Sequence, residues 1–121
     1  GVLLLGGSEG GLDEAGAALF ASRGYAAFAL AYFGTEGLPS ELVNIPIEYV
    51  VRALKWLQSR PEVNADRIAI IGRSRGTELA LLTAALRPEV KAVVAIGPSS
   101  VFWGGIPKSP ASGPTAAWIY E

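Results

Sequence analysis

Neither cysteine nor histidine occurs among the 121 residues of the chain. Without cysteine, a disulfide framework and thiolate metal ligands are excluded, and without histidine the commonest metal ligand and the usual general base are missing. We therefore expect no metal site. A nucleophilic serine on this chain would need a general base other than imidazole, or one supplied from elsewhere.

An excess of charge is absent as well, since ten lysines and arginines stand against eleven aspartates and glutamates, for a net charge of -1. This balance, without a basic run, argues against a nucleic-acid partner. The longest apolar run, at residues 26–33, is far shorter than the roughly 20 residues of a membrane span, and no signal segment is present. With no export signal and no cysteine, we expect a cytoplasmic protein.

Short apolar runs alternate with segments of helical periodicity along most of the chain. The apolar runs predict strands at 2–5, 26–32, 67–71 and 90–96, the first two of them buried, and the periodic segments predict helices at 13–22, 47–59 and 77–86. The apolar face of the first helix is predicted at Ala15, Ala18, Leu19 and Phe20, and residues 34–46 are predicted to be a loop. This alternation predicts an α/β fold, a three-layer arrangement in which a mainly parallel sheet carries helices on both faces.

The composition changes after residue 97, where glycine, proline and serine become dominant. The length of the chain corresponds to one domain. An apolar run follows Gly1 directly, and an apolar run leads to Glu121 without a turn or a polar tail. We therefore expect residues 1–97 to be part of a larger, truncated domain and residues 98–121 to be irregular. The apolar strand at 90–96 is expected to offer an open edge for self-association.

The pentapeptide Gly-x-Ser-x-Gly, which in hydrolases places a serine on a sharp turn between a strand and a helix, occurs at 6–10 and at 72–76. After Ser74 the helical pattern resumes almost at once, so its hydroxyl is expected at the positive end of a helix. After Ser8 come Glu9 and two glycines, which predicts a longer loop whose backbone N–H groups can hold an oxyanion. Ser74 is the predicted nucleophile, and the alternative is a turn serine that only caps a helix.

Other residues near these turns have both a functional and a structural interpretation. The first glycine-rich turn has neither the P-loop pattern nor that of a dinucleotide fold, so no nucleotide or other cofactor is expected. Glu9 can act as an acid or base, or can be a solvated carboxylate. Arg73 and Arg75 can attract an anionic substrate, or can be solvated. Tyr32 and Phe33 can line a substrate pocket, or can pack in the core.

Several segments, taken in order along the chain, resemble the α/β-hydrolases, and among these the C-terminal catalytic domain of acyl-CoA thioesterases and bile acid-CoA:amino acid N-acyltransferases. The segments that carry the resemblance lie at 5–12 (Leu-Gly-Gly-Ser-Glu-Gly-Gly-Leu), 21–25, 29–33, 38–39, 47–49, 60–63 and 72–80. The resemblance implies that residues 1–97 are the N-terminal part of a hydrolase catalytic domain. It also implies that the substrate is an acyl-CoA or another small ester or thioester.

The same resemblance implies roles for individual residues. By its position in the motif, Ser74 attacks the thioester carbonyl, and the backbone N–H of Arg75 holds the oxyanion together with that of Ser8 or Glu9. Because this position is serine and not cysteine, the chain resembles the hydrolysing members of the family rather than the members that conjugate amino acids. The resemblance therefore favours hydrolysis of the thioester. Position 73 is usually apolar or small in the family and is arginine here, which places a charge beside the substrate pocket.

The resemblance also implies that the acid and the base follow later strands, which are expected beyond Glu121 or at best in the segment 98–121. Without them a serine hydroxyl stays protonated near neutral pH, so this chain alone is expected to be inactive. Two other interpretations stay open. The segment Asn-Ala-Asp-Arg-Ile at 64–68 also resembles dienelactone hydrolases and prolyl peptidases, and a truncated hydrolase fold can serve as a non-catalytic assembly module.

Overall fold

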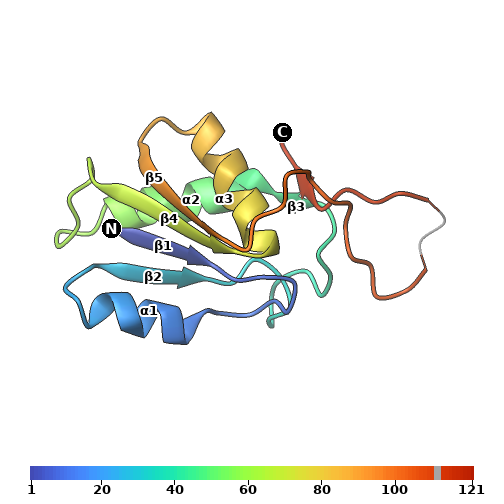
Figure 1. Cartoon of the computed structure of the whole chain (residues 1–121), viewed down its shortest axis with the longest axis horizontal. Coiled ribbons are helices and arrows are strands. Elements are labelled where there is room, and N and C mark those ends of the chain that lie inside the picture. The colour runs from blue at the N-terminus through green and yellow to red at the C-terminus, as the bar shows by residue number, and fades with distance from the viewer. Residues whose placement is uncertain (111–112) are drawn as a thin grey trace.

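Four parallel strands form the central sheet of the computed structural model, which describes residues 1–110 and 113–121 (Figure 1). The strands are β1 (Val2–Leu5), β2 (Ala27–Leu30), β4 (Ile68–Arg73) and β5 (Val90–Ile96). They lie in the order β2-β1-β4-β5, and each neighbouring pair is parallel. Each strand coincides with an apolar run of the sequence, so the predicted sheet is confirmed.

Helices cover both faces of this sheet, which confirms the three-layer α/β prediction (Figure 1). Helix α1 (Glu14–Ala21) lies on one face, and α2 (Ile47–Gln58) and α3 (Arg75–Leu86) lie on the other. Asp13 caps α1, since its Oδ1 accepts a 3.0 Å hydrogen bond from the Gly16 N–H. Among the helices of the described residues, none is long and apolar enough to cross a membrane.

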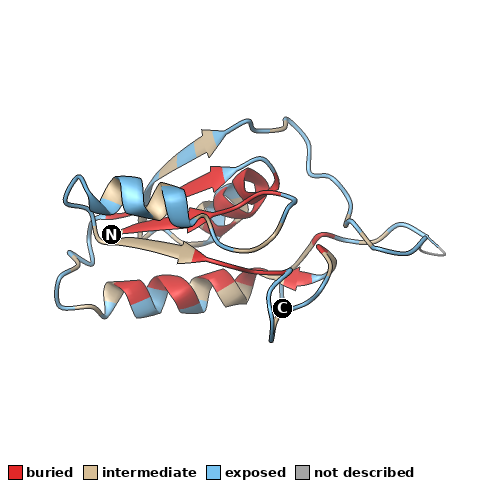
Figure 2. Cartoon of the chain, turned by 90° about the horizontal axis from the view of Figure 1, so that it is seen from below, coloured by how far each residue is buried: buried red, intermediate tan, exposed pale blue. Residues whose placement is uncertain are grey.

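The main core lies between the sheet and helices α2 and α3 (Figure 2). Leu3 of β1 and Ile70 of β4 are fully buried in one cluster with Val50 and Leu54 of α2 and Leu79 of α3. The apolar residues of α2 recur every three or four positions, so one side of this helix faces the sheet along its whole length. This packing fixes α3, and with it the turn at which α3 begins.

Helix α1 packs on the opposite face through fewer side chains, and none of its residues is fully buried (Figure 2). The cluster on this face consists of Val2, Leu4, Ile71, Ala17, Phe20 and Ala27. The predicted apolar face is wrong for Ala15, Ala18 and Leu19, which are exposed. Alanines lie on several sides of this helix, so the apolar pattern did not show which side faces the sheet.

A second, two-stranded sheet joins distant parts of the chain. Its strands, β3 (Ile45–Pro46) and β6 (Trp118–Ile119), are parallel to each other. Strand β3 begins inside the predicted loop 34–46, and β6 lies in the segment 98–121, for which only irregular structure was expected. The end of the chain therefore returns to the body of the molecule and contacts it beside α2.

Candidate active site

The segment that joins β4 to α3 makes a sharp turn at Ser74. Strand β4 ends at Arg73 and helix α3 begins at Arg75, so a single residue connects them. Ser74 has φ 50° and ψ -119°, a conformation that costs a non-glycine residue roughly 1–3 kcal/mol and that concentrates at active sites. The strand is longer, and the helix starts earlier, than the sequence pattern predicts, and both differences sharpen the turn.

Two glycines allow this turn because they leave space where backbone segments approach one another. A β-carbon on Gly72 would overlap the carbonyl oxygen of Gly76, and a β-carbon on Gly76 would overlap the carbonyl oxygen of Gly6. Both glycines of the second pentapeptide are therefore required by packing, as expected of a strand-turn-helix motif.

Ser74 is exposed, and its side chain makes no capping hydrogen bond to α3. Its N–H donates to the Ile96 carbonyl oxygen at 2.8 Å, and its carbonyl oxygen accepts from the N–H and the Oγ1 of Thr77 at 2.9 and 2.7 Å. Ser74 is the N-cap residue of α3, but its hydroxyl does not cap the helix. The backbone N–H and carbonyl groups of Ser74 are thus hydrogen-bonded within the fold, whereas its side chain lies at the surface.

The first glycine-rich turn lies directly beside Ser74. Strands β1 and β4 are neighbours, with Leu5 paired to Gly72, so the segments that follow them leave the sheet at the same edge. A β-carbon on Gly7 would lie only 3.2 Å from the β-carbon of Ser74. The two strand ends are thus side by side, as the spacing of the two pentapeptides allowed.

Ser8 and Glu9 are the central residues of a turn in this loop, which a 3.3 Å hydrogen bond from the Gly10 N–H to the Gly7 carbonyl oxygen closes. Both central residues are exposed. Within residues 1–110 and 113–121, neither the Ser8 N–H nor the Glu9 N–H donates to another backbone group. Backbone N–H groups without a backbone acceptor, beside an exposed serine, are the groups from which an oxyanion hole is built.

Two aromatic residues that follow β2 support the loop. Tyr32 is 2% exposed, and its hydroxyl donates a 2.6 Å hydrogen bond to the Gly6 carbonyl oxygen. Burial raises the pKa of the Tyr32 hydroxyl, so this group keeps the proton that it donates. The carbonyl oxygen of Phe33, which is also buried, accepts a 3.2 Å hydrogen bond from the Gly11 N–H.

A cavity with a volume of about 280 Å³ adjoins the loop. Its lining includes Ser8, Glu9, Phe33, Leu42, Ile106 and Lys108. Phe33 thus lies where the sequence predicted a pocket residue. Tyr32, for which the same role was predicted, is not part of this lining and is buried under the loop instead.

Residues 45–109, which carry Ser74, match the family model described as "BAAT / Acyl-CoA thioester hydrolase C terminal". This match covers more than half of the chain. The chain belongs to this family. The resemblance inferred from the sequence is therefore confirmed.

The curated relatives of the chain include members with two activities in their names. Acyl-coenzyme A amino acid N-acyltransferase 2 of Rattus norvegicus is 42% identical over 103 residues, which are 84% of this chain and 25% of the relative. Mitochondrial acyl-coenzyme A thioesterase 2 of Homo sapiens is 37% identical over 105 residues, 87% of this chain and 22% of the relative. The chain thus spans about a quarter of the length of these two relatives.

The two arginines that flank the serine have different surroundings in this acyl-CoA thioester hydrolase family member. The Nη2 of Arg73 donates to Oε1 of Glu9, and both side chains are half exposed. Arg75 is buried, and its Nη2 donates to the carbonyl oxygens of Trp103 and Gly104 at 3.0 and 2.9 Å. Arg75 therefore neither offers its charge to a substrate nor is solvated, and both interpretations of its side chain were wrong.

A buried carboxylate near the serine turn was missed by the sequence analysis. Glu78 is 2% exposed, and its Oε1 lies 3.5 Å from Nε of Arg75, which is an ion-pair contact rather than a hydrogen bond. Its Oε2 accepts a 2.9 Å hydrogen bond from Nε1 of Trp118, whose ring centroid lies 5.8 Å from that of Tyr32. The i,i+3 spacing of Arg75 and Glu78 was the available signal. Their burial depends on β6, which no local pattern indicated.

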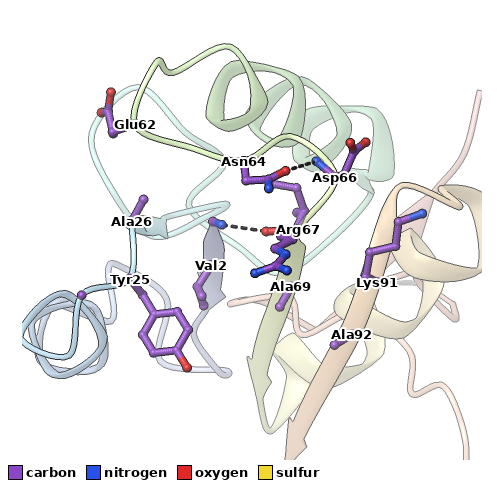
Figure 3. Close-up of a pocket in the computed structure, with 13 residues that line it drawn as sticks. Val2, Tyr25, Ala26, Glu62, Asn64, Asp66, Arg67, Ala69, Lys91 and Ala92 are labelled. Atoms are coloured by element: carbon purple, nitrogen blue, oxygen red, sulfur yellow. Dashed lines mark hydrogen bonds between the residues drawn. The ribbon is translucent and has the colours of Figure 1, made fainter.

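Another cavity, with a volume of about 420 Å³, opens at the opposite edge of the sheet (Figure 3). It lies at the amino ends of the strands, beside Val2 and Ala69, whereas Ser74 follows the carboxyl end of β4. Asn64 and Asp66 stand at its rim, and Oδ1 of Asn64 accepts a 3.0 Å hydrogen bond from the Asp66 N–H (Figure 3). Open α/β sheets bind ligands at the carboxyl ends of their strands, and Ser74 lies at that end of the sheet.

Proposed function

We propose that the complete gene product containing this chain hydrolyses acyl-CoA thioesters and that Ser74 is its nucleophile. The observation that carries the proposal is an exposed serine on a strained, single-residue turn, beside a glycine-rich loop whose central residues are exposed. Membership of the acyl-CoA thioester hydrolase family and similarity to proteins named acyl-coenzyme A thioesterase support the thioester as substrate.

In the proposed reaction, the Ser74 Oγ attacks the carbonyl carbon of the thioester, and the carbonyl oxygen becomes an oxyanion. The N–H of Arg75, at the positive end of α3, and the N–H of Ser8 or Glu9 donate hydrogen bonds to this oxyanion. When the intermediate collapses, the carbon–sulfur bond breaks and coenzyme A leaves as a thiol, with a proton from the general acid. Water then hydrolyses the acyl-serine, which releases the acid and restores the hydroxyl.

The proposed mechanism requires a general base that these 121 residues do not supply. A serine hydroxyl is a weak nucleophile near neutral pH unless an adjacent base takes its proton. The chain has no histidine, and Glu9, the carboxylate beside the serine turn, is paired with Arg73. We therefore assign the acid and the base to residues outside this chain, and we expect the isolated chain to be inactive.

The cavity beside the loop suggests where the acyl group lies. Phe33 supplies an apolar wall next to Ser8 and Glu9, so we assign it to the acyl group of the substrate. Tyr32 is assigned to the support of the loop, because its hydroxyl is bound to Gly6. Arg73 remains at the rim of the site in its pair with Glu9.

Transfer of the acyl group to an amino acid is the second candidate, because the chain is also similar to a rat acyl-coenzyme A amino acid N-acyltransferase. The two reactions share the attack by Ser74 and differ in the group that accepts the acyl chain. Incubation of an acyl-CoA with the complete gene product, with and without glycine, separates them by mass spectrometry. We expect the free acid in both cases, and an N-acyl amino acid would establish the second candidate instead.

A fluorophosphonate probe tests the nucleophile, because it reacts with activated serine hydroxyls. Applied to the complete gene product, it is expected to label the peptide that contains Ser74. Ser74→Ala should abolish labelling, the matched variant Ser8→Ala should keep it, and the isolated chain should not react. Labelling of Ser8, or no labelling of a folded protein, would contradict the proposal. Preferred turnover of a lactone or a proline-containing peptide would contradict the thioester assignment.

A further inference from the structure

Glu9 and Arg73 lie 64 positions apart in the sequence and meet at the serine turn. Arg73 donates to the Glu9 carboxylate, and each side chain is 50% exposed. Glu9 is at the tip of the glycine-rich loop, and Arg73 is the residue before Ser74. The ion pair therefore connects the segment that offers amides to an oxyanion with the segment that carries the serine.

One 3.3 Å hydrogen bond, from the Gly10 N–H to the Gly7 carbonyl oxygen, closes the turn at the tip, and the other hydrogen bonds of the loop fix its two ends. The Tyr32 hydroxyl holds the Gly6 carbonyl oxygen, and the Phe33 carbonyl oxygen holds the Gly11 N–H. Between these points the tip is flanked by glycine on both sides, and Gly10 has φ +71°. Because glycine rotates easily about its backbone bonds, the peptide groups at the tip need a further restraint to keep one orientation.

We propose that Arg73 and Glu9 are positioning residues that lock the tip of the loop onto the serine turn, so that the Ser8 and Glu9 N–H groups stay directed toward the oxyanion. The inference rests on the proposed function, because it assumes that an oxyanion forms at Ser74. It assigns Arg73 to the loop of its own protein rather than to a charged group of the substrate, since its guanidinium is already bound to a carboxylate.

The two partners are not equivalent in this arrangement. Removal of Arg73 leaves the Glu9 carboxylate unpaired beside the place where negative charge develops, and this repulsion adds to the loss of the restraint. Removal of Glu9 leaves a guanidinium there, which attracts the oxyanion and offsets part of the loss. Arg73→Ala should therefore lower kcat more than Glu9→Ala does.

Steady-state hydrolysis of an acyl-CoA by the complete gene product, followed through the released thiol, measures the effect. We expect Arg73→Ala to lower kcat roughly tenfold and Glu9→Ala roughly threefold, which exceeds the effect of most exposed ion pairs but is smaller than the loss of an oxyanion donor. KM should change little. The double variant Arg73→Ala/Glu9→Ala should be faster than Arg73→Ala alone, because the unpaired carboxylate is gone. Arg73→Lys should recover most of kcat.

The pair Arg87 and Glu89 is a matched control, since its atoms are 2.6 Å apart in an ion pair that is also partly exposed but lies at the far end of α3. Arg87→Ala and Glu89→Ala should leave kcat unchanged. Raised salt should lower kcat of the wild type toward that of the double variant, because screening weakens an exposed pair.

Two results would overturn the inference while leaving the proposed function intact. One is an unchanged kcat in Arg73→Ala with a raised KM, which would make Arg73 a substrate contact. The other is a loss of kcat in the double variant that equals the combined losses of the two single variants, which would show that Arg73 and Glu9 act independently. Activity that survives in Ser74→Ala would instead remove the proposed function itself.

Discussion

Two segments of this chain have the sequence Gly-x-Ser-x-Gly, but only one of them forms a single-residue turn from a strand into a helix. At residues 72–76 the helix begins directly after the serine. At residues 6–10 the strand ends at Leu5 and the next helix begins only at Glu14, so the same pattern relaxes into a loop. The position of the next helix, rather than the pentapeptide, decides the conformation of the serine.

The steric demand on the glycines differs in the same way. At Gly72 and Gly76 a β-carbon would overlap backbone atoms, whereas at Gly6 its nearest neighbour would be the Gly11 carbonyl oxygen at 3.9 Å. The backbone that closes on Gly76 is that of Leu5 and Gly6. The loop therefore forms one wall of the turn, and the two pentapeptides lie against each other.

The largest expected difference between the two segments is chemical. Ser74→Ala should lower kcat for acyl-CoA hydrolysis by the complete gene product by on the order of 10⁴-fold, because it removes the attacking atom. Ser8→Ala should change kcat by less than about threefold, since only its backbone N–H is assigned a role. Release of coenzyme A thiol measures both, with thermal melting as the control for folding. Equal losses of kcat in the two variants would contradict the different roles assigned to Ser74 and Ser8.

The helix after Ser74 is locked by a buried ion pair, and the loop after Ser8 is held by an exposed one. Glu78→Ala should lower the free energy of unfolding by about 3 kcal/mol, because it leaves the buried Arg75 charge without its carboxylate. Glu9→Ala should lower it by less than about 1 kcal/mol, since exposed pairs contribute little. Chemical denaturation of both variants gives the two values. A stability loss in Glu9→Ala as large as that in Glu78→Ala would contradict the difference in burial.

The first glycine of each pentapeptide gives a third test. Gly72→Ala should destabilise the protein by about 2 kcal/mol, because the new methyl group forces α3 away from β4. Gly6→Ala meets only ordinary contacts and should cost less than about 1 kcal/mol. Denaturation midpoints measure stability, and fluorophosphonate labelling of Ser74 should fall in Gly72→Ala alone. If both alanines were tolerated, the close approach of α3 to β4 would not be required.

The smallest expected effect concerns the support of the loop. Tyr32→Phe removes the hydrogen bond to Gly6 and should cost about 1 kcal/mol. Burial raises the pKa of Tyr32 in the folded state. The stability that the protonated hydroxyl contributes is therefore complete below about pH 10, the pKa of tyrosine in the unfolded chain, and is lost as the pH rises above that value.

The melting temperature of the wild type should therefore fall more steeply above about pH 10 than that of Tyr32→Phe. Tyr120→Phe, at an exposed tyrosine, is the matched control and should keep the steep fall. Parallel slopes in wild type and Tyr32→Phe would show that the buried hydroxyl does not contribute to this dependence.

The fold could be predicted from the sequence where burial is local and repetitive. The strands at 2–5 and 90–96 have the predicted boundaries, because each is an apolar run between glycine or charged residues. Helix α2 was clear from its apolar period. Helix α1 was found, but its rotation was not, since its many alanines do not distinguish one face from another.

The site was predictable to the extent that it follows strand ends. Ser74 and the glycine-rich loop adjoin because β1 and β4 are neighbours in a parallel sheet. The buried role of Arg75 was not predictable, because its partners are the carbonyl oxygens of Trp103 and Gly104, which no local pattern brings to α3. Burial of a charge depends on contacts across the chain, whereas hydropathy describes single positions.

The N–H of Ser74 donates a hydrogen bond to Ile96, the last residue of β5. Within residues 1–110 and 113–121, β5 is an end strand of the four-stranded sheet and pairs with β4 alone. A chain that detached β5 would also free the serine from the bond that keeps it in its high-energy conformation. The conformation of the serine turn would then be lost before the rest of the core unfolds, since β5 adds only the partly buried Val90 and Val93 to the cluster around Leu3 and Val50. Among the described residues, the serine turn thus depends on one of the least protected strands of the sheet.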